Sequence, residues 1–423
     1  MIHFSRGSQT DDISKNDLKE AIYGVFEKLG KRKKVLALPP DFTRFHSRAG
    51  EITNLSFQYY RDSMSDILPA LGTHAPMSEK EITEMFVDVP HSLFRVHNWR
   101  NDVVTIGTVP SDYIKEVSEG KVEYDWQAQI NKLIRDGGHD LILSIGQVVP
   151  HEVVGMANHA KNIFVGTGGK EGINKSHFLG AVYGMERMMG RADTPVRKVL
   201  NYACNHFLKD YPVLYILTVI GKDQNGCFVI RGLYIGDDEE CFNMAASLSL
   251  KVNFQLLDRP MKKVVVYLDP SEFKSTWLGN KSIYRTRMAI ADNGELIVLA
   301  PGLKEFGEDP EIDKLIRKYG YVGSEKVLEL TKNNSDLQAN LSAAAHLIHG
   351  SSENRFKITY CTDKISGAEM ESVNFNHADL AVMMQKYNPN NLKDGWNFAD
   401  GEEFFYISNP ALGLWAYKDR FNN

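Results

Sequence analysis

Residues 141–149 read LILSIGQVV, an almost continuous apolar run. A run of this kind is typical of a strand that is buried on both faces of a sheet. Similar runs occur at 35–40 (VLALPP), 264–269 (VVVYLD) and 295–302 (ELIVLAPG). Stretches with helical spacing lie between them, such as residues 16–29, which end at Gly30, a residue suited to terminate a helix. This alternation predicts an α/β fold with mainly parallel sheets.

The sequence contains two α/β units separated by a polar joint at residues 258–260. We therefore predict an N-terminal α/β domain over 1–258 and a C-terminal α/β domain over 259–404, with an active-site cleft between them. Helices are expected at 57–71, 125–135 and 281–290, and a hairpin is expected from 213–221 and 227–236. The aromatic-rich segment 405–423 is predicted to pack back on the N-terminal domain.

The composition excludes several classes of protein. Hydrophobic residues make up 43% and charged residues 24%, so the chain can bury a core and is neither disordered nor a small stapled scaffold. With 49 basic and 54 acidic residues, the net charge of -5 argues against nucleic-acid binding. The four cysteines form no CxxC pair, which fits a reducing compartment. No run is long enough to cross a membrane, and the start lacks an apolar signal segment, so we expect a cytoplasmic protein.

Polar side chains follow the predicted strands. Asp41, Thr43 and Arg44 come directly after the run at 35–40. Ligands bind at the carboxyl ends of strands in open α/β sheets, so these residues are candidates for a binding site. A surface turn with a helix cap and an Asp41–Arg44 ion pair would also account for them. Two later candidates, His74 after a Gly-Thr pair and His97, would be packed or surface residues on the simpler interpretation.

The stretch from 150 to 177 contains the most chemistry. Its GTGGKEG segment lacks both GxxxxGK[ST] and GxGxxG spacing, so it is not a nucleotide-binding fingerprint. The histidines and lysines of the stretch suit general acid–base chemistry and one point of metal or covalent attachment. These side chains are His151, His159, His177, Lys161 and Lys170.

In their order and spacing these segments resemble the nickel-pincer lactate racemases. That family carries a DxTR segment, as at Asp41–Arg44, then a Gly-Thr-His segment, as at 72–74, and then PHxxxG, as at 150–155. A lysine and a second histidine follow, which correspond to Lys161 and His177. The family's Ser-Gly-Gly before the lysine is replaced here by 157–159 (Ala-Asn-His), and Lys170 in a Gly-Gly-Lys segment is a competing candidate for the lysine.

The resemblance implies a cofactor and a set of residue roles. The cofactor is the nickel-pincer nucleotide, a pyridinium-3,5-bisthiocarboxylic acid mononucleotide that holds nickel and accepts a hydride from the substrate. On this resemblance His177 binds the nickel and Lys161 attaches the cofactor. His74 and His151 exchange the hydroxyl proton, one for each enantiomer, and Arg44 binds the substrate carboxylate.

Further roles follow from the same resemblance. Asp41, Thr43 and Tyr284 are expected to bind the cofactor. Near residue 283 the family has Tyr-Gln followed by a lysine, whereas this chain reads Tyr284-Arg285-Thr286-Arg287. Arg285 and Arg287 are therefore expected to bind a substrate more polar than lactate. Neighbouring helical positions do not face the same way, so only one of the two arginines should point into the cleft, and surface ion pairs are the simpler alternative.

We accordingly predict an isomerase, a racemase or epimerase that inverts C2 of a polar 2-hydroxy acid, such as the sugar acid gluconate. The alternatives are a racemase of lactate or another short 2-hydroxy acid, a nicotinamide-type dehydrogenase, and a non-catalytic small-acid binding protein on the same scaffold. The expected partners are the small-molecule substrate and the enzymes that make the cofactor, with neither nucleic acid nor a membrane. A homo-oligomer is one alternative for the oligomeric state.

Overall fold

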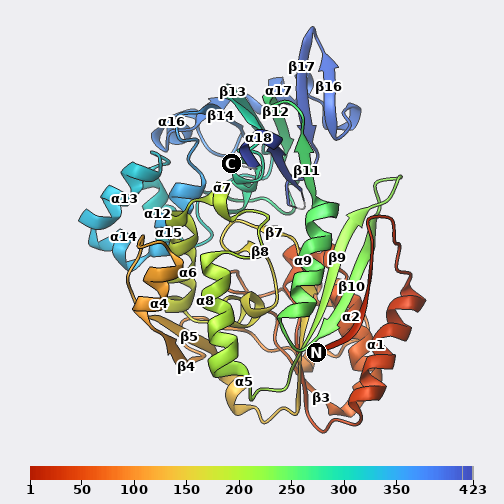
Figure 1. Ribbon diagram of the computed structural model, residues 1–423. Coiled ribbons are helices and arrows are strands. Elements are labelled where there is room, and N and C mark those ends of the chain that lie inside the picture. Colours follow the sequence, from red (N-terminus) through yellow and green to blue (C-terminus); the bar gives the residue numbers. More distant parts are fainter. Residues whose placement is uncertain (412, 422–423) are drawn as a thin grey trace. The chain divides into compact units, whose positions relative to one another are not determined.

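The computed structural model describes residues 1–411 and 413–421, which form two compact units (Figure 1). Unit 1 consists of Met1–Leu179 and Gly190–Asn253, and unit 2 combines Gly180–Met189 with the chain from Phe254 onward. The chain leaves unit 1 for the last time close to the predicted boundary at residue 259. The short excursion at Gly180–Met189 was not foreseen.

Unit 1 is built on a six-stranded sheet of order β1-β10-β9-β6-β2-β3. The strands β3, β2, β6 and β9 are parallel, and β9, β10 and β1 are joined by antiparallel pairing. The β9–β10 hairpin and the mainly parallel sheet are as predicted. The bounds are β1 Ile2–Gly7, β2 Val35–Leu38, β3 Met64–Ile67, β6 Leu141–Gln147, β9 Val213–Lys222 and β10 Phe228–Gly236.

Helix α1 (Lys15–Leu29) confirms the helix predicted at 16–29. Ser14 caps its first turn in a capping box with Asp17, and Gly30 ends it at φ 76°, a left-handed value that glycine adopts without strain. The apolar positions of α1 are buried in the same core as Leu141, Leu143 and Ile145 of β6. The amphipathic pattern therefore fixes which face of the sheet this helix covers.

The point where β2 meets its neighbours positions the site. β2 pairs with β3 on one side and with β6 on the other. The chain therefore continues from β2 toward one edge of the sheet and from β6 toward the opposite edge. A switch of this kind opens a crevice at the carboxyl ends of the strands. The residues that follow β2, β3 and β6 therefore gather at one edge of the sheet.

Two predicted helices of unit 1 are wrong. Instead of one helix at 57–71, α2 (Ala49–Tyr60) ends before β3, because the segment that starts at Met64 pairs with β2. Instead of a helix at 125–135, β5 (Trp126–Asn131) is followed by the short α5 (Lys132–Asp136). Alternate residues of β5 are buried, a period of two that the helical interpretation overlooked.

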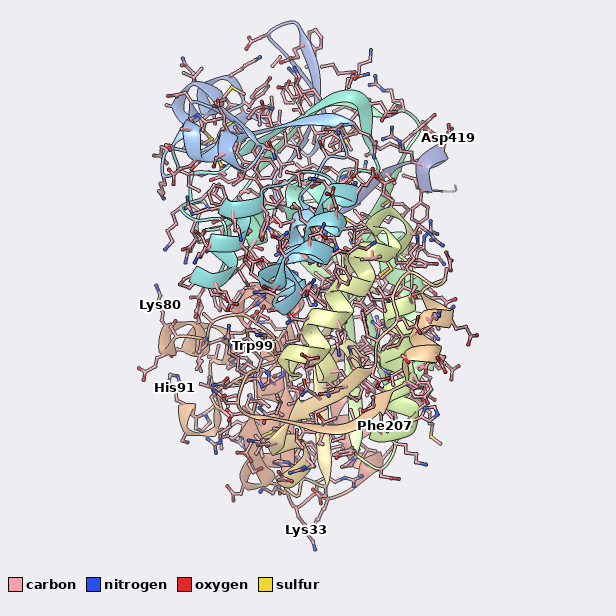
Figure 2. The ribbon with its side chains drawn as sticks, turned by 90° about the vertical axis from the view of Figure 1, so that its left-hand side faces the viewer. Lys33, Lys80, His91, Trp99, Phe207 and Asp419 are labelled. Atoms are coloured by element: carbon pink, nitrogen blue, oxygen red, sulfur yellow. The ribbon has the colours of Figure 1, made fainter. Side chains whose placement is uncertain are left out.

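Strand β5 pairs antiparallel with β4 (Val103–Val109), outside the main sheet. Gly107 of β4 leaves room for the Phe207 ring, since a Cβ there would lie 2.4 Å from it, and Figure 2 shows Phe207 beside this strand pair. The helices of unit 1 not yet given, with its short hairpin β7–β8, are η1 Phe42–Ser47, η2 Arg61–Ser63, α3 Glu79–Phe86, η3 His91–Leu93, α4 Ser111–Val117, β7 Pro150–His151, β8 Gly155–Met156, η4 Asn162–Gly166, α6 Lys170–Tyr183, α8 Pro195–Ala203, η5 Cys204–Leu208 and α9 Glu239–Asn253.

Unit 2 has a second six-stranded sheet of order β15-β14-β13-β12-β17-β16, parallel except for the β16–β17 pair. A parallel pair, β11 with β18, stands apart. The strands are β11 Phe254–Leu257, β12 Met261–Tyr267, β13 Ile290–Leu299, β14 Phe356–Cys361, β15 Asn376–Ala378, β16 Gly395–Ala399, β17 Glu402–Ile407 and β18 Leu414–Tyr417.

The last segment of the chain differs from its prediction. Residues 405–421 belong to unit 2, because β17 pairs with β12 in the middle of the sheet and β18 pairs with β11. The aromatic residues that suggested a return to the N-terminal domain are instead core positions, for example Phe405 and Tyr406 at 1% exposure.

The helix expected at 281–290 is also shorter than predicted, since α11 covers only Lys281–Tyr284. The other helices of unit 2 are α7 Met185–Met188, α10 Thr276–Gly279, α12 Pro310–Tyr319, α13 Ser324–Asn333, α14 Ser335–Ala339, α15 Leu341–His349, α16 Gly367–Ser372, α17 Leu380–Lys386, η6 Pro389–Asn391 and α18 Lys418–Phe421. Among the described residues of the chain, none of the helices has the length and apolar character that crossing a membrane requires.

Candidate active site

The first two candidate segments meet at the ends of β2 and β3. The parallel pairing continues beyond the strands, with a bridge between Pro40 and Ala70, so the residues that follow them stay side by side. As a result Asp41 Oδ2 lies 2.5 Å from His74 Nδ1. The contact joins two residues 33 positions apart in the sequence, and it turns two separate sequence candidates into one dyad.

Asp41 is held in its charged form. Burial alone would raise the pKa of this carboxyl group, but the interactions with His74, the hydrogen bond from Thr43 and the charge of Arg44 lower it to about 2. Both the backbone N–H and the hydroxyl of Thr43 donate to Asp41 Oδ1, at 3.1 and 2.5 Å. Thr43 therefore orients Asp41, and Asp41 orients His74.

Arg44 has an unused donor. Its Nη1 atom is buried and has no hydrogen-bond partner among the described residues. The guanidinium group belongs to the short helix η1, and Asp41 is the N-cap of that helix. A planar guanidinium with a free N–H can bind a carboxylate, because its fork matches the two carboxylate oxygens.

His151 is the second buried histidine at this edge. It lies on the β7–β8 hairpin that follows β6, and it is 6% exposed. Its Nδ1 atom accepts a hydrogen bond from the backbone N–H of Val153 at 3.1 Å, and Glu152 Oε2 lies 3.5 Å from the same nitrogen. A neutral His151 therefore carries its proton on Nε2, whereas His74 donates its Nδ1 proton to Asp41 and keeps the Nε2 lone pair.

Lys161 is a half-buried amine near these groups. Burial, and then the positive charge of Arg44, lower the pKa of Lys161 to about 8, while Glu152 and Asp41 oppose the shift. Within the described residues the ammonium group makes no hydrogen bond and no ion pair. The following residue, Asn162, donates to Leu38 O and Ser144 Oγ, both at 3.0 Å, which anchors Lys161 beside β2 and β6.

The backbone before Lys161 supports it as the counterpart of the family's lysine. Asn158 and His159 have φ values of 69° and 57°, the left-handed region that glycine adopts without strain. They stand at the two positions where the family has Gly-Gly, so the backbone shape fits although the residues differ. The competing candidate, Lys170, is exposed at the start of α6.

His177 has the hydrogen-bonding pattern that is typical of metal-binding histidines. It lies on α6, and its Nδ1 atom donates to the carbonyl oxygen of Ile173 at 2.7 Å, which leaves the lone pair on Nε2. Burial, assisted by the charges of Lys161 and His74, lowers the pKa of His177 to about 4. A neutral imidazole whose second nitrogen is bonded to a carbonyl is the usual state of a metal-binding histidine.

The described side chains do not form a complete metal centre. Within residues 1–411 and 413–421, no group of three or more His, Cys, Asp or Glu side chains is arranged to hold a metal ion.

Two histidines singled out by sequence have structural roles. His97 is buried, and its ring nitrogens are bonded to Gly168 O and to Asn131 Nδ2, so it holds the glycine turn that precedes α6. His159 is 2% exposed and packs 3.9 Å from the Tyr215 ring, centroid to centroid. Burial, and then the charge of Arg197, lower its pKa to about 3, so it stays neutral.

The candidate residues of unit 2, Tyr284, Arg285 and Arg287, are all buried in the protein interior. The expectation was that one of the two arginines would point into the cleft. Arg287 is bound to Glu186, with Nε and Oε1 3.1 Å apart, and its Nη1 donates to Ser351 O. Arg285 Nη1 donates to Gly413 O at 3.0 Å, and the Tyr284 ring packs against His349. Arg287 thus serves an ion pair inside unit 2, which removes the basis for assigning it to the substrate.

Two features of the site were missed by sequence reasoning. Glu152 acts on His151, Lys161 and His177, and its position directly after a candidate histidine was the available signal. Gln147, the last residue of β6, is 5% exposed and its amide nitrogen lies 3.0 Å from His46 Nε2. His46 lies two residues after Arg44, and no sequence spacing connects it with Gln147.

The low pKa of Asp41 predicts an acid-dependent loss of stability. A carboxyl group with a pKa of about 2 when folded and 3.8 when unfolded stabilises the fold above pH 4, by roughly 2 kcal/mol, and this contribution disappears as the pH falls toward 2. Asp41→Asn should therefore lower the free energy of unfolding at pH 7 but make it less sensitive to pH between 4 and 2. Urea unfolding at a series of pH values measures this, and parallel curves for the two proteins would contradict it.

Comparison with known proteins identifies a similar family and two similar structures. Residues 24–189 match the family described as the lactate racemase N-terminal domain. A crystal structure of a protein from Thermotoga maritima has 24% sequence identity and a TM-score of 0.83, and the match covers 96% of this chain and 99% of that one. The lactate racemase apoprotein from Thermoanaerobacterium thermosaccharolyticum has 16% identity and a TM-score of 0.70, with 96% and 93% covered.

At these identities the two structures show that the fold is shared and nothing finer. Curated protein sequences give no match. The family match spans Asp41, His74, His151, Lys161 and His177, the residues on which the resemblance in the sequence rested. Residues 24–189 are therefore similar to the lactate racemase N-terminal domain, and the fold of the chain is shared with that of the lactate racemase apoprotein.

Proposed function

We propose that this protein is a racemase or epimerase that inverts C2 of a polar 2-hydroxy acid and works with the nickel-pincer nucleotide. The observation that carries the proposal is the gathering of two differently bonded histidines, a half-buried lysine and an unpaired arginine nitrogen at one edge of the unit 1 sheet. A site that only binds an acid needs the arginine but has no use for the other three.

The residues present fit the cofactor. Lys161, with its lowered pKa and without a hydrogen-bond partner, is suited to form a covalent bond through its amine. His177 offers a neutral Nε2 to nickel, a metal that imidazole binds well. When bound, the cofactor supplies a hydride acceptor that can return the hydride to either face of C2.

The chain's own residues would handle binding and protons. Arg44 binds the substrate carboxylate through its unpaired Nη1. His74 accepts the hydroxyl proton at Nε2, because its Nδ1 proton is held by Asp41. His151 acts on the opposite side of the substrate: its charged form, with protons on both nitrogens, gives up the Nε2 proton and becomes neutral, and Glu152, 3.5 Å from Nδ1, stabilises the charged form.

The polarity near Arg44 favours a substrate that carries more than a methyl group. The Gln147–His46 pair lies where β6 and η1 reach the carboxyl edge of the sheet, two residues from Arg44 along the chain. Gln147 and His46 bond to each other, and a substrate hydroxyl beside them can join this hydrogen-bonded pair, whereas a methyl group gains nothing there. The hydroxyl groups of an aldonate such as gluconate therefore suit this side of the site.

A substrate panel tests this proposal. Protein produced together with the cofactor-making enzymes should epimerise an aldonate faster than lactate, as measured by loss of label from C2 and by the ratio of epimers. Gln147→Leu should reduce aldonate turnover by about tenfold or more and leave lactate turnover nearly unchanged, so lactate serves as the internal reference. Lactate turning over faster than every aldonate and dicarboxylate would overturn the substrate assignment.

A further inference from the structure

Arg197 is a buried arginine without an acidic partner. It lies in the first turn of α8 and is 2% exposed. None of the described residues places a carboxylate within ion-pair distance of its guanidinium group, whose Nε and Nη1 atoms are buried and lack hydrogen-bond partners. An unpaired charge in the interior is costly, so its presence requires a reason.

The bonds that Arg197 does make all go to one segment. Its Nη2 atom donates to the carbonyl oxygens of Met156 at 2.6 Å and Asn158 at 3.2 Å. Thr194, the N-cap of the same helix, donates from its hydroxyl to Val154 O at 3.1 Å. The start of α8 thus supplies donors to every second carbonyl group along residues 154–158.

Those carbonyl groups border two residues with left-handed backbone. Asn158 and His159 interrupt the chain between β8 and η4, and Asn158 O also accepts a bond from the backbone N–H of Lys161 at 3.3 Å. Such backbone strain persists only where surrounding contacts impose it. The contacts here are the Arg197 bonds, the His159 ring on Tyr215, and the bond from His159 Nε2 to Asp238 O.

We propose that Arg197 is a positioning residue that holds segment 154–159 in the shape that presents Lys161. The inference rests on the proposed function, in which Lys161 attaches the cofactor, and it assigns control of that attachment to a residue that never touches the cofactor. Arg197 reaches Lys161 through the backbone, because the two carbonyl groups it binds lie three and five residues before the lysine. The positive charge of Arg197 also lowers the pKa of Lys161, so hydrogen exchange is the measurement that reports the backbone effect by itself.

An anion-binding role for the same residues fits less well. The guanidinium plane is covered by Phe242, whose ring centre lies 4.0 Å from Cζ. Arg197 is therefore packed as part of the interior.

The test compares three variants of the cofactor-free, full-length protein. Arg197→Met keeps the packing on Phe242 and removes the donors, Arg197→Lys keeps the charge without the planar fork, and Arg231→Met is the matched control. Arg231 also donates to two backbone carbonyl groups, Asp11 O and Lys222 O, but away from Lys161. The first measurement is hydrogen exchange of the peptide that covers 154–162. The second is the pH dependence of Lys161 acetylation by an amine-reactive ester, read by mass spectrometry.

In R197M, exchange in this peptide should become at least about tenfold faster, and the midpoint of Lys161 acetylation should move up toward that of an ordinary amine. R197K should give intermediate values, and R231M should match the wild type in both measurements. Wild-type exchange and an unchanged acetylation midpoint in R197M would overturn the proposal. If R197M does not fold, the same outcome in R197K would overturn it.

Cofactor-loaded protein separates this inference from the function on which it rests. An adduct on Lys161 in the wild type and R231M, but reduced in R197M, would support both. Faster exchange in R197M together with no adduct on Lys161 in the wild type would support the positioning role and overturn the attachment.

Discussion

Lys161→Ala is expected to abolish covalent loading of the cofactor. The wild-type protein, produced with the cofactor-making enzymes, should carry extra mass on the peptide that contains Lys161, and the variant should carry none. The reason is chemical, since burial and the charge of Arg44 lower the pKa of Lys161 to about 8, which makes more of the reactive neutral amine available than in an ordinary lysine. Epimerisation should fall to the limit of detection, while thermal unfolding should change little because the ammonium group makes no hydrogen bond in the described residues.

Lys170→Ala is the matched control for this experiment. It removes an exposed lysine that starts α6, nine residues further along the chain, and should leave the adduct in place. An adduct found on Lys170 would contradict the alignment of this chain with the family's lysine. Nickel bound without any adduct would mean that the cofactor is held non-covalently.

Replacing His74 and replacing His151 should slow the reaction of opposite stereoisomers most strongly. Each cycle uses both side chains, so His74→Ala and His151→Ala should each slow epimerisation in both directions by about 10²–10⁴-fold. The two differ in bonding, because His74 Nδ1 faces Asp41 whereas His151 Nδ1 accepts from Val153. The rate of hydride removal from one stereoisomer should therefore fall more in His74→Ala, and the rate for the other stereoisomer should fall more in His151→Ala. Substrates deuterated at C2 measure both rates.

Nickel analysis and a control variant complete this test. Both variants should retain nickel, whereas His177→Ala should lose it, since the Nε2 lone pair of His177 is the ligand that unit 1 offers. His91→Ala is the control, an exposed histidine on η3 that Figure 2 shows at the surface, and it should behave as the wild type. Equal and mild losses in both site variants would contradict the assignment of the two bases.

Much of the site could be predicted because parallel strands end at a common edge. Asp41 and His151 each follow a strand that an apolar run in the sequence predicted, whereas β3, the strand before His74, was predicted as part of a helix. The helix at 57–71 failed because pairing with β2 outweighed local helical spacing, an effect that only the partner strand reveals.

Other features leave no mark in the sequence. Nothing around residue 197 indicates that its side chain binds the carbonyl groups of Met156 and Asn158, because the contact joins segments about forty residues apart. The left-handed shape of Asn158 and His159 is likewise imposed by tertiary contacts on residues that do not require it. Arg287 was expected to bind the substrate because of the family resemblance near residue 283. Its ion pair with Glu186 could not be foreseen, because Glu186 lies a hundred residues earlier, in a segment that leaves unit 1 only briefly.

The strand order of unit 1 also sets the moment at which the site can first exist during synthesis. β2 pairs with β6 rather than only with its sequence neighbour β3, and β6 in turn pairs with β9, which ends at Lys222. A nascent chain that has released only its first hundred residues from the ribosome therefore has Asp41 and His74 but no partner strand to complete the edge. Long-range pairing of this kind forms late in folding. Under the proposed function, cofactor-making enzymes would meet a competent Lys161 only after more than half of the polypeptide has emerged, so loading would follow the folding of unit 1.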